Sequence, residues 1–286
     1  MEISEYLKKK ILVVAYDSGS ANQIYYFLKN YKKKFKTFVK GPAKKIFKKN
    51  DFHTLTEAIQ MSDIVLTGTG WQSKLEVNAI KNSKKLGKEV ISFIDESINF
   101  NHRFTLDKNF FYPNIIFTRS KEAYDKCKKL CPKEVKVIKT KDHFLDYVKK
   151  NKIKPQKKNI VYLSSNFDGF RSKQKRKNKT IDIKLLDIFQ KKIKKHNYLK
   201  KEKIYLRLHP SENANKYLRC SNFINMNIEI SKKTNLLDCL KNFKYAFGCE
   251  TYGLVIAKNY GLNAYNNLIC TPIKSNMLKK YNIKTF

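Results

Sequence analysis

Short apolar runs rich in β-branched residues alternate with longer amphipathic segments along most of the chain. In residues 9 to 30, the first example, an apolar run is followed by a Gly/Ser turn and a helix-like segment. The same order recurs at KTFVKG, SDIVLTGTG, KEVISFIDES, NIIFTRS and EVKVIKT. Continuous apolar strands that alternate with helices are typical of parallel sheets covered on both faces. The first half of the chain therefore predicts a Rossmann-like domain.

The same alternation begins again after a charged stretch at residues 146 to 158, which contains Pro155 and lacks sustained apolar periodicity. We predict a linker there. The second set of strand and helix segments comprises NIVYLSSNFDGF, EKIYLRLHPSEN and KYAFGCETYGLVIAKNYGLNAYNN. The sequence thus predicts an α/β protein with two Rossmann-like domains, residues 1–150 and 151–286, that face a central cleft.

The charge balance limits the classes of partner. The chain has 61 Lys and Arg residues against 24 Asp and Glu, a formal net charge of +37. Only six of the basic residues are arginine, the side chain that reads bases and phosphates with a bidentate fork, and the lysines are spread along the whole chain. We therefore do not expect nucleic acid as a partner. A field of this sign favours anionic substrates and peripheral association with an anionic membrane.

Cysteine usage and hydropathy indicate the compartment. The six cysteines form no CxxC pair, which favours reduced thiols over a disulfide framework or a zinc site. No apolar run approaches the roughly 18 residues that span a bilayer, so we expect a cytoplasmic protein that can associate with the inner face of the membrane. The sequence contains no DxD pair to hold a divalent metal on a diphosphate, and no metal is expected.

Candidate binding residues in the second domain follow predicted strands. His209 ends a strand and is fixed by Pro210, so its imidazole is expected to contact a phosphate; the alternative is an ordinary turn. The other nucleotide- or donor-binding candidates are the loop residues Ser164, Ser165 and Asn166, the strand residue Arg207, and Glu250, Thr251 and Gly253 at a helix start. For residues 164–166, the alternative to ligand binding is an ordinary βα turn. For the helix start at residues 250–253, the alternative is simple capping by Thr251.

Candidate residues in the first domain begin with two adjacent acids, Asp95 and Glu96, after a buried strand. One of them is expected to take a proton from an attacking hydroxyl, whereas a structural acid would more often pair with Arg103. The loop residues Asp17, Ser18 and Gly19, the single tryptophan Trp71, and Arg103 are expected to line the acceptor side of the cleft. Trp71 would stack on a sugar there, although core packing is an equal alternative.

Taken together, YDSGSAN, GTGWQSKLEVNAIKNSKKLG, VISFIDESINFNHRF, LRLHPSE and GCETYGLVIAKNYG resemble a bacterial two-domain glycosyltransferase of the GT-B type. The sequence is most similar to the sialyltransferase-like group, whose members transfer sialic acid, Kdo and related 2-keto sugar acids. The resemblance implies an acidic motif that supplies the base, matched by Asp95 with Glu96. It also implies a His-Pro motif, matched by His209 and Pro210, that contacts the phosphate of a CMP-sugar.

The resemblance further implies inverting transfer without metal or cofactor, from a CMP-sugar to a surface glycan that is anionic or lipid-linked. Asp95 would be the base, with Glu96 as its substitute, and Arg103 or Arg207 would hold the carboxylate of the donor sugar. Ser97 stands where the family usually has glycine, which leaves the choice between the two acids open.

Two other functions fit parts of the sequence. A nucleotide-sugar epimerase of the UDP-GlcNAc 2-epimerase type shares the two-Rossmann plan and the Gly/Ser/Glu helix start, and it would bind UDP instead of CMP. A non-enzymatic basic protein of membranes or nucleic acid would bind RNA with steep salt dependence and ignore nucleotides.

Overall fold

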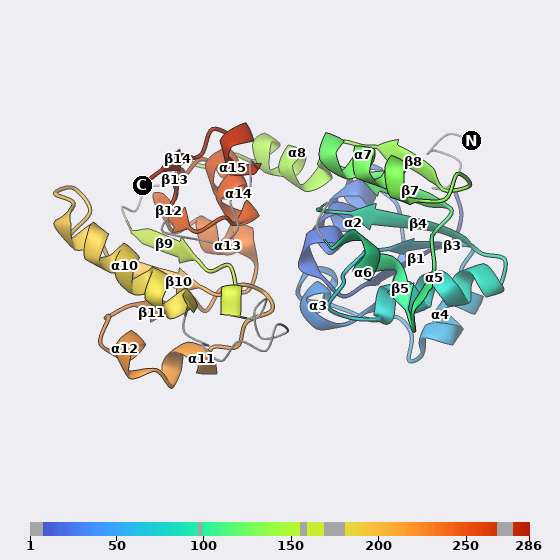
Figure 1. The fold of residues 1–286 in the computed structure, drawn as a ribbon, viewed down its shortest axis with the longest axis horizontal. Helices are drawn as coiled ribbons and strands as arrows, with labels where there is room; N and C mark the ends of the chain where they lie inside the picture. The colour runs from blue at the N-terminus through green and yellow to red at the C-terminus, as the bar shows by residue number, and fades with distance from the viewer. Residues whose placement is uncertain (1–7, 97–98, 155–158, 169–180, 268–276) are drawn as a thin grey trace. The chain divides into compact units, whose positions relative to one another are not determined.

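In the computed structural model the chain divides into two compact units, Met1–Tyr147 and Val148–Phe286 (Figure 1). The structure describes residues 8–96, 99–154, 159–168, 181–267 and 277–286. Each unit has a six-stranded parallel sheet with helices packed on it. The predicted α/β class with two Rossmann-like domains is confirmed.

The first sheet has the strand order β2-β1-β3-β4-β7-β8. Its strands are β1 (Ile11–Ala15), β2 (Lys36–Val39), β3 (Ile64–Thr67), β4 (Glu89–Ile94), β7 (Ile115–Thr118) and β8 (Lys136–Lys139). The order reverses between β1 and β3, because the chain first adds β2 on one side of β1 and then continues on the other side. A reversal of this kind is the point at which open α/β sheets bind ligands beyond the carboxyl ends of the strands.

Helices cover both faces of this sheet because its central strands are buried on both sides. One face packs against α2 (Ser18–Asn30), and the other packs against α4 (Leu55–Gln60), α5 (Leu75–Lys85), α6 (Phe100–Phe104) and α7 (Lys121–Leu130). Alternate residues of β1 serve the two cores: Val13 faces α2, and Val14 faces α4 and α5. This division explains the unbroken apolar runs of the sequence.

The first unit also has η1 (Gly41–Ala43) and α3 (Lys44–Phe47) after β2, and a two-stranded antiparallel sheet of β5 (Thr105–Leu106) and β6 (Asn109–Phe110) after α6.

The second sheet has the order β11-β10-β9-β12-β13-β14. Its strands are β9 (Ile160–Leu163), β10 (Ile204–Arg207), β11 (Glu229–Ile230), β12 (Tyr245–Gly248), β13 (Asn263–Asn266) and β14 (Lys284–Thr285). Because β10 and β12 flank β9 in parallel, the loops that follow these three strands begin at the same edge of the sheet.

The helices of this unit are α10 (Ile181–Lys195), α11 (Asn215–Leu218), α12 (Ser221–Ile224), α13 (Leu236–Leu240), α14 (Tyr252–Tyr260) and α15 (Met277–Lys280). The core between α10 and the sheet includes Phe189, Leu186, Tyr162 and Phe247.

The division between the two units falls within the predicted linker of residues 146–158, but the first part of this stretch is helical. Residues 143 to 150 form α8 (His143–Lys150), and the division between the two units falls inside this helix. Phe144, Leu145 and Val148 are buried at helical spacing, and Phe144 stacks on Tyr26 at a ring-centroid distance of 5.0 Å. Tertiary packing of this apolar stripe outweighs the polar composition. Pro155 lies outside the described residues.

None of the helices in the described part of the chain is both long and apolar enough to cross a membrane. Five of the cysteines lie in this part, and all five are free thiols, whereas Cys270 lies outside it.

Candidate functional site

In the second unit, three loops meet at the carboxyl edge of adjacent strands. Ser164, Ser165 and Asn166 follow β9, His209 to Glu212 follow β10, and Cys249 to Thr251 follow β12. The hydroxyl of Ser165 donates to the Cys249 carbonyl, and Asn166 Nδ2 donates to Ser211 Oγ at 2.8 Å. The sheet thus brings together candidate residues of these three segments.

His209 begins a tight turn with Pro210 in its second position. The Glu212 N–H donates to the His209 carbonyl at 2.9 Å, and the His209 N–H donates back to Glu212 Oε2 at 2.8 Å. Proline fits the second position of such a turn because its fixed φ is the one required there. The functional prediction and the turn alternative for His209 are therefore compatible.

Burial lowers the pKa of His209 to about 4, and the nearby cations Arg207 and Lys216 act in the same direction, against the opposing charge of Glu212. The imidazole is neutral at neutral pH. It can donate one hydrogen bond to a ligand without carrying a charge.

Arg207 is buried at the end of β10. Its guanidinium donates to the carbonyls of Leu208 and Thr234, both at 2.9 Å. Both of these contacts are to backbone atoms, and they connect Leu208 with Thr234.

The start of α14 lies next to the β9 loop. Thr251 caps the helix by accepting from the Gly253 N–H at 3.3 Å, as the capping alternative predicted. A Cβ on Gly253 would lie 3.0 Å from Leu163 Cδ1, so glycine permits the close approach of α14 to β9. Glu250 has a left-handed φ of +48° and accepts from Asn266 Nδ2 at 2.7 Å.

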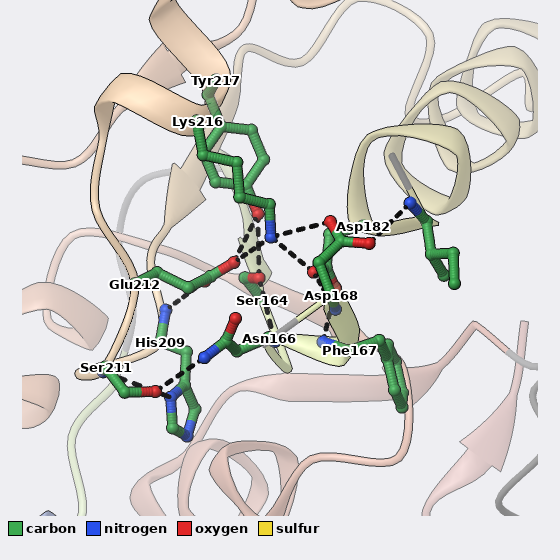
Figure 2. A network of polar contacts seen from close by, with 11 residues as sticks. Ser164, Asn166, Phe167, Asp168, Asp182, His209, Ser211, Glu212, Lys216 and Tyr217 are labelled. Atoms are coloured by element: carbon green, nitrogen blue, oxygen red, sulfur yellow. Dashed lines mark hydrogen bonds and ion pairs between the residues drawn. The ribbon is translucent and has the colours of Figure 1, made fainter. Parts of the chain in front are cut away.

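A network that the sequence did not reveal supports the β10 loop. Lys216 on α11 contacts Glu212 at 2.7 Å, Asp168 at 3.1 Å and Asp182 at 2.5 Å, and the Tyr217 hydroxyl donates to Glu212 at 2.9 Å (Figure 2). The spacing of Glu212 and Lys216 by four residues was the only local sequence signal for it. The contact of Lys216 with Asp182 at the start of α10 joins residues that are far apart in the sequence, so no local pattern predicts it.

In the first unit, the acids lie at the carboxyl ends of β1 and β4. Asp95 follows β4, and its Oδ1 lies 3.0 Å from a nitrogen of Arg103, which also donates to the Thr69 carbonyl at 2.8 Å. Arg103 is nearly inaccessible, with 3% of its side chain exposed, against 13% for Asp95. Arg103 thus pairs with Asp95, which was the alternative to a role of this acid as the base.

Glu96 makes a different pair. Its carboxylate contacts Arg119 at 2.7 Å, and the same guanidinium contacts Asp142 at 2.9 Å and donates to the Asp95 carbonyl at 2.6 Å. These bonds hold the backbone at Asp95 from the side of β7. With 38% of its side chain exposed, Glu96 is the more solvent-accessible of the two acids.

The loop after β1 brings a third acid to Asp95. Asp17 caps α2 by accepting from the Gly19 N–H at 3.1 Å, and Ser18 begins the helix. A Cβ on Gly19 would overlap Asp95 Oδ2, so glycine is required for this approach. Burial raises the pKa of Asp17 to about 6, and the charge of Asp95 adds to the shift. Trp71 lies half-buried in the turn after β3.

A fourth acid, Glu76, was missed by sequence reasoning. It lies in the first turn of α5, is 1% exposed, and accepts from the N–H groups of Tyr16 at 2.9 Å and Gly70 at 2.6 Å. Burial raises its pKa to about 8. Among the described residues, no group of three or more potential ligands could hold a metal ion.

Comparisons with known proteins bear on the fold. No protein-family model and no curated protein matches the chain. A structure from Listeria monocytogenes, described as a UDP-N-acetylglucosamine 2-epimerase, matches with a TM-score of 0.58 and 12% identity, over 92% of this chain and 80% of that one. MnaA of S. aureus, in a co-structure with UDP, matches with a TM-score of 0.59 and 13% identity, over 95% and 82%. The fold is of the GT-B type.

The GT-B fold that the sequence resemblance implied is confirmed, whereas membership of the sialyltransferase-like group stays a prediction. At identities of 12% and 13%, the similarity to these structures shows the fold alone. The chemistry of this chain has to be argued from its own residues.

Proposed function

We propose that the protein is a glycosyltransferase that uses a nucleotide-sugar donor without a metal ion. The observation that carries this proposal is the convergence of three loops at one edge of the second sheet. They present the neutral imidazole of His209 and the start of the nine-residue helix α14. Ser164 and Ser165 support the loops, because their hydroxyl groups already donate to Tyr217 and to the Cys249 carbonyl. Neutral donors and a helix N-terminus are suited to the phosphate of a nucleotide.

The first unit would bind the acceptor and supply the base. In the proposed step, Asp95 takes the proton of an acceptor hydroxyl, and the oxygen attacks the anomeric carbon. The bond between this carbon and the phosphate oxygen breaks, so that the nucleotide leaves with its phosphate hydrogen-bonded to His209. Asp17 is the second candidate base, because it lies beside Asp95 and its pKa of about 6 leaves it mostly ionised at neutral pH. Glu96 lies one residue farther from the end of β4 than Asp95, so we expect it to be dispensable.

The finer proposal concerns the donor and acceptor. The sequence resemblance favours a CMP-linked 2-keto sugar acid and a glycan acceptor that is anionic or lipid-linked. The net charge of +37 would attract both, and would also favour peripheral contact with an anionic membrane.

A second candidate function is a UDP-sugar epimerase. It is favoured by the two GT-B structures described above, one described as a UDP-N-acetylglucosamine 2-epimerase and the other solved with UDP. The phosphate site proposed here would bind the phosphate of a UDP-sugar equally well. The two candidate functions are therefore distinguished by which nucleotide, CMP or UDP, the protein binds.

Thermal unfolding in the presence of CMP, CDP, UDP or GDP tests the proposal. We expect stabilisation by CMP, which supports transfer of a keto-sugar acid. Stabilisation by UDP alone, with inversion at C2 of UDP-N-acetylglucosamine detected by NMR, would favour the epimerase. His209→Asn should weaken the nucleotide response at least ~10-fold through the lost hydrogen bond. The matched control is His102→Asn, at an exposed histidine of the first unit. No response to any nucleotide would contradict both enzymatic candidates.

Once a turnover assay exists, Asp95→Asn, Asp17→Asn and Glu96→Gln identify the base. Loss of a general base lowers kcat by roughly 100-fold or more while nucleotide binding persists. We expect this loss for Asp95→Asn and near-normal kcat for Glu96→Gln. Full activity of Asp95→Asn with an inactive Asp17→Asn would move the role of base to Asp17.

A further inference from the structure

The imidazole of His209 is held by hydrogen bonds on one of its two nitrogens. Its Nδ1 accepts from the Ser211 N–H at 3.3 Å and lies 2.7 Å from Ser211 Oγ. The Nε2 atom points away from the network in Figure 2, and no residue in the described part of the chain bonds to it. The two nitrogens therefore have different tasks.

The direction of the Ser211 hydrogen bond follows from the backbone of the same residue. The Ser211 N–H donates to Nδ1 at 3.3 Å, so Nδ1 has its lone pair there, and the neighbouring Ser211 hydroxyl donates to it as well. Asn166 Nδ2 donates to Ser211 Oγ at 2.8 Å, which fits because this oxygen is then free to accept. Nδ1 accepts from both the N–H and the O–H of Ser211, so the one proton of the neutral imidazole lies on Nε2.

Asn166 is suited to this task by its backbone. It adopts a left-handed φ of +56°, a conformation that asparagine tolerates better than most residues. This turns the chain directly after β9 and directs the amide to the β10 loop. The requirement explains why asparagine follows the Ser164–Ser165 pair.

The base of the turn is rigid. The carboxylate of Glu212 is wholly buried and accepts from the His209 N–H, the Tyr217 hydroxyl and Lys216. Tyr217 in turn lies 3.0 Å from Ser164 Oγ. The His209 backbone is thus tied to the loop after β9 through the side chains of Glu212, Tyr217 and Ser164.

We propose that Asn166 and Ser211 are positioning residues that present His209 as a neutral donor, through Nε2–H, to a phosphate oxygen. This inference rests on the proposed nucleotide site. It adds that the contact is a directed hydrogen bond instead of a charge pair, which distinguishes it from the general attraction of anions to a lysine-rich surface. In this proposal, residues 164–166 and the turn of residues 209–212 (HPSE) act together to position the imidazole of His209.

Nitrogen-15 NMR of the histidine side chains in the full-length protein tests the tautomer directly. The His209 signals are assigned by their loss in His209→Asn. We expect a protonated Nε2 and an unprotonated Nδ1 at pH 7, and a shift of the Nε2 signal on titration with inorganic phosphate, CMP or UDP. A proton on Nδ1, or a cationic ring at pH 7, would overturn the inference whether or not a nucleotide binds.

Two variants test the positioning residues. The aspartate of Asn166→Asp cannot donate to Ser211. The Ser211 hydroxyl would donate to the new carboxylate instead, and its oxygen could then accept a hydrogen bond from a protonated Nδ1 of His209. We expect the pKa of His209 to rise by about one unit or more. Ser211→Ala removes one donor to Nδ1 and should lower nucleotide affinity by roughly 3- to 10-fold. The matched control, Ser221→Ala at an exposed serine of the same unit, should leave the His209 spectrum and the affinity unchanged.

The outcomes separate the two proposals. The expected tautomer, with variant shifts and a response to inorganic phosphate but to no nucleotide, would support the positioning role and contradict the proposed function. Nucleotide binding with a His209 spectrum that neither variant changes would support the function and overturn the positioning role. Thermal unfolding of each variant shows whether it is folded.

Discussion

At the scale of single residues, Glu76 is the acid with the clearest consequence for stability. Its carboxyl is buried between the loops after β1 and β3 and accepts from one backbone N–H of each. Those two bonds favour the ionised form, but burial and the charges of Asp17 and Asp95 outweigh them and raise its pKa to about 8. The folded protein holds a proton at Glu76 at neutral pH.

We expect stability to fall as the pH rises from 6.5 to 8 because of this proton. The unfolded chain has released it well below this range, since an exposed glutamate ionises with an ordinary pKa of 4.5, so the native state binds more protons than the unfolded state. One such proton changes the free energy of unfolding by up to about 1.4 kcal/mol per pH unit. Below pH 6.5, His143 and His209, whose pKa values are lowered to about 4, contribute the opposite trend, against Asp17 and Asp182, whose pKa values are raised to about 6.

Urea unfolding at several pH values between 6.5 and 8 measures this slope in wild type and Glu76→Gln. The variant should lose most of the slope, whatever its stability at pH 6.5, while the exposed-acid control Glu134→Gln should keep it. An equal slope in Glu76→Gln and wild type would mean that another group releases the proton.

The residues themselves show what a single sequence can and cannot reveal. Asp95 directly follows β4 and His209 comes two residues after β10, and both were predicted as site residues because strand ends are recognisable in the chain. Glu76 looked like an ordinary first-turn acid of a helix, because its partners Tyr16 and Gly70 come from other strands. Pairing of Arg103 with an acid was one of two alternatives, but nothing in the sequence indicated that Arg103 would be buried against Asp95.

At the scale of elements, Lys216 joins three segments of the second unit. Its ammonium on α11 contacts Glu212 of the β10 loop, Asp168 after β9 and Asp182 at the start of α10. Only 19% of its side chain is exposed, and the three carboxylates are exposed by 6% or less. One cation thus neutralises part of a buried acidic cluster.

Replacing Lys216 with Met should therefore be strongly destabilising. Removing one partner of a buried ion pair leaves uncompensated charge and costs about 3–5 kcal/mol. The acids in the variant would have raised pKa values when folded, so the deficit should be larger at pH 8 than at pH 5. Lys191→Met, which breaks an exposed pair with Asp187 on α10, is the control and should change little. Equal unfolding free energies for the two variants would show that the cluster does not need its cation.

Elements were predictable where the sequence pattern and the packing agree. The strands were recognised because both of their faces are buried, which gives short β-branched runs. Helix α8 was missed because its apolar stripe is short and lies among lysines, and its stability comes from packing of Phe144 on Tyr26. Cross-loop contacts such as Asn166 to Ser211 follow from strand order, which a single sequence does not specify.

At the scale of the whole molecule, the net charge and the proposed site predict different patterns of ligand protection. A charge of +37 attracts any anion to many lysines, whereas a nucleotide site protects a few amides. Hydrogen exchange followed by mass spectrometry, with CMP or UDP at about 100 times its Kd, resolves the two. We expect slower exchange at residues 164–166, 209–212 and 250–254, by up to about 100-fold where the amides exchange only from the free protein. Sulfate at equal ionic strength is the control and should not reproduce the pattern. Protection spread over lysine-rich helices of both units, and abolished by salt, would instead favour a non-enzymatic basic protein.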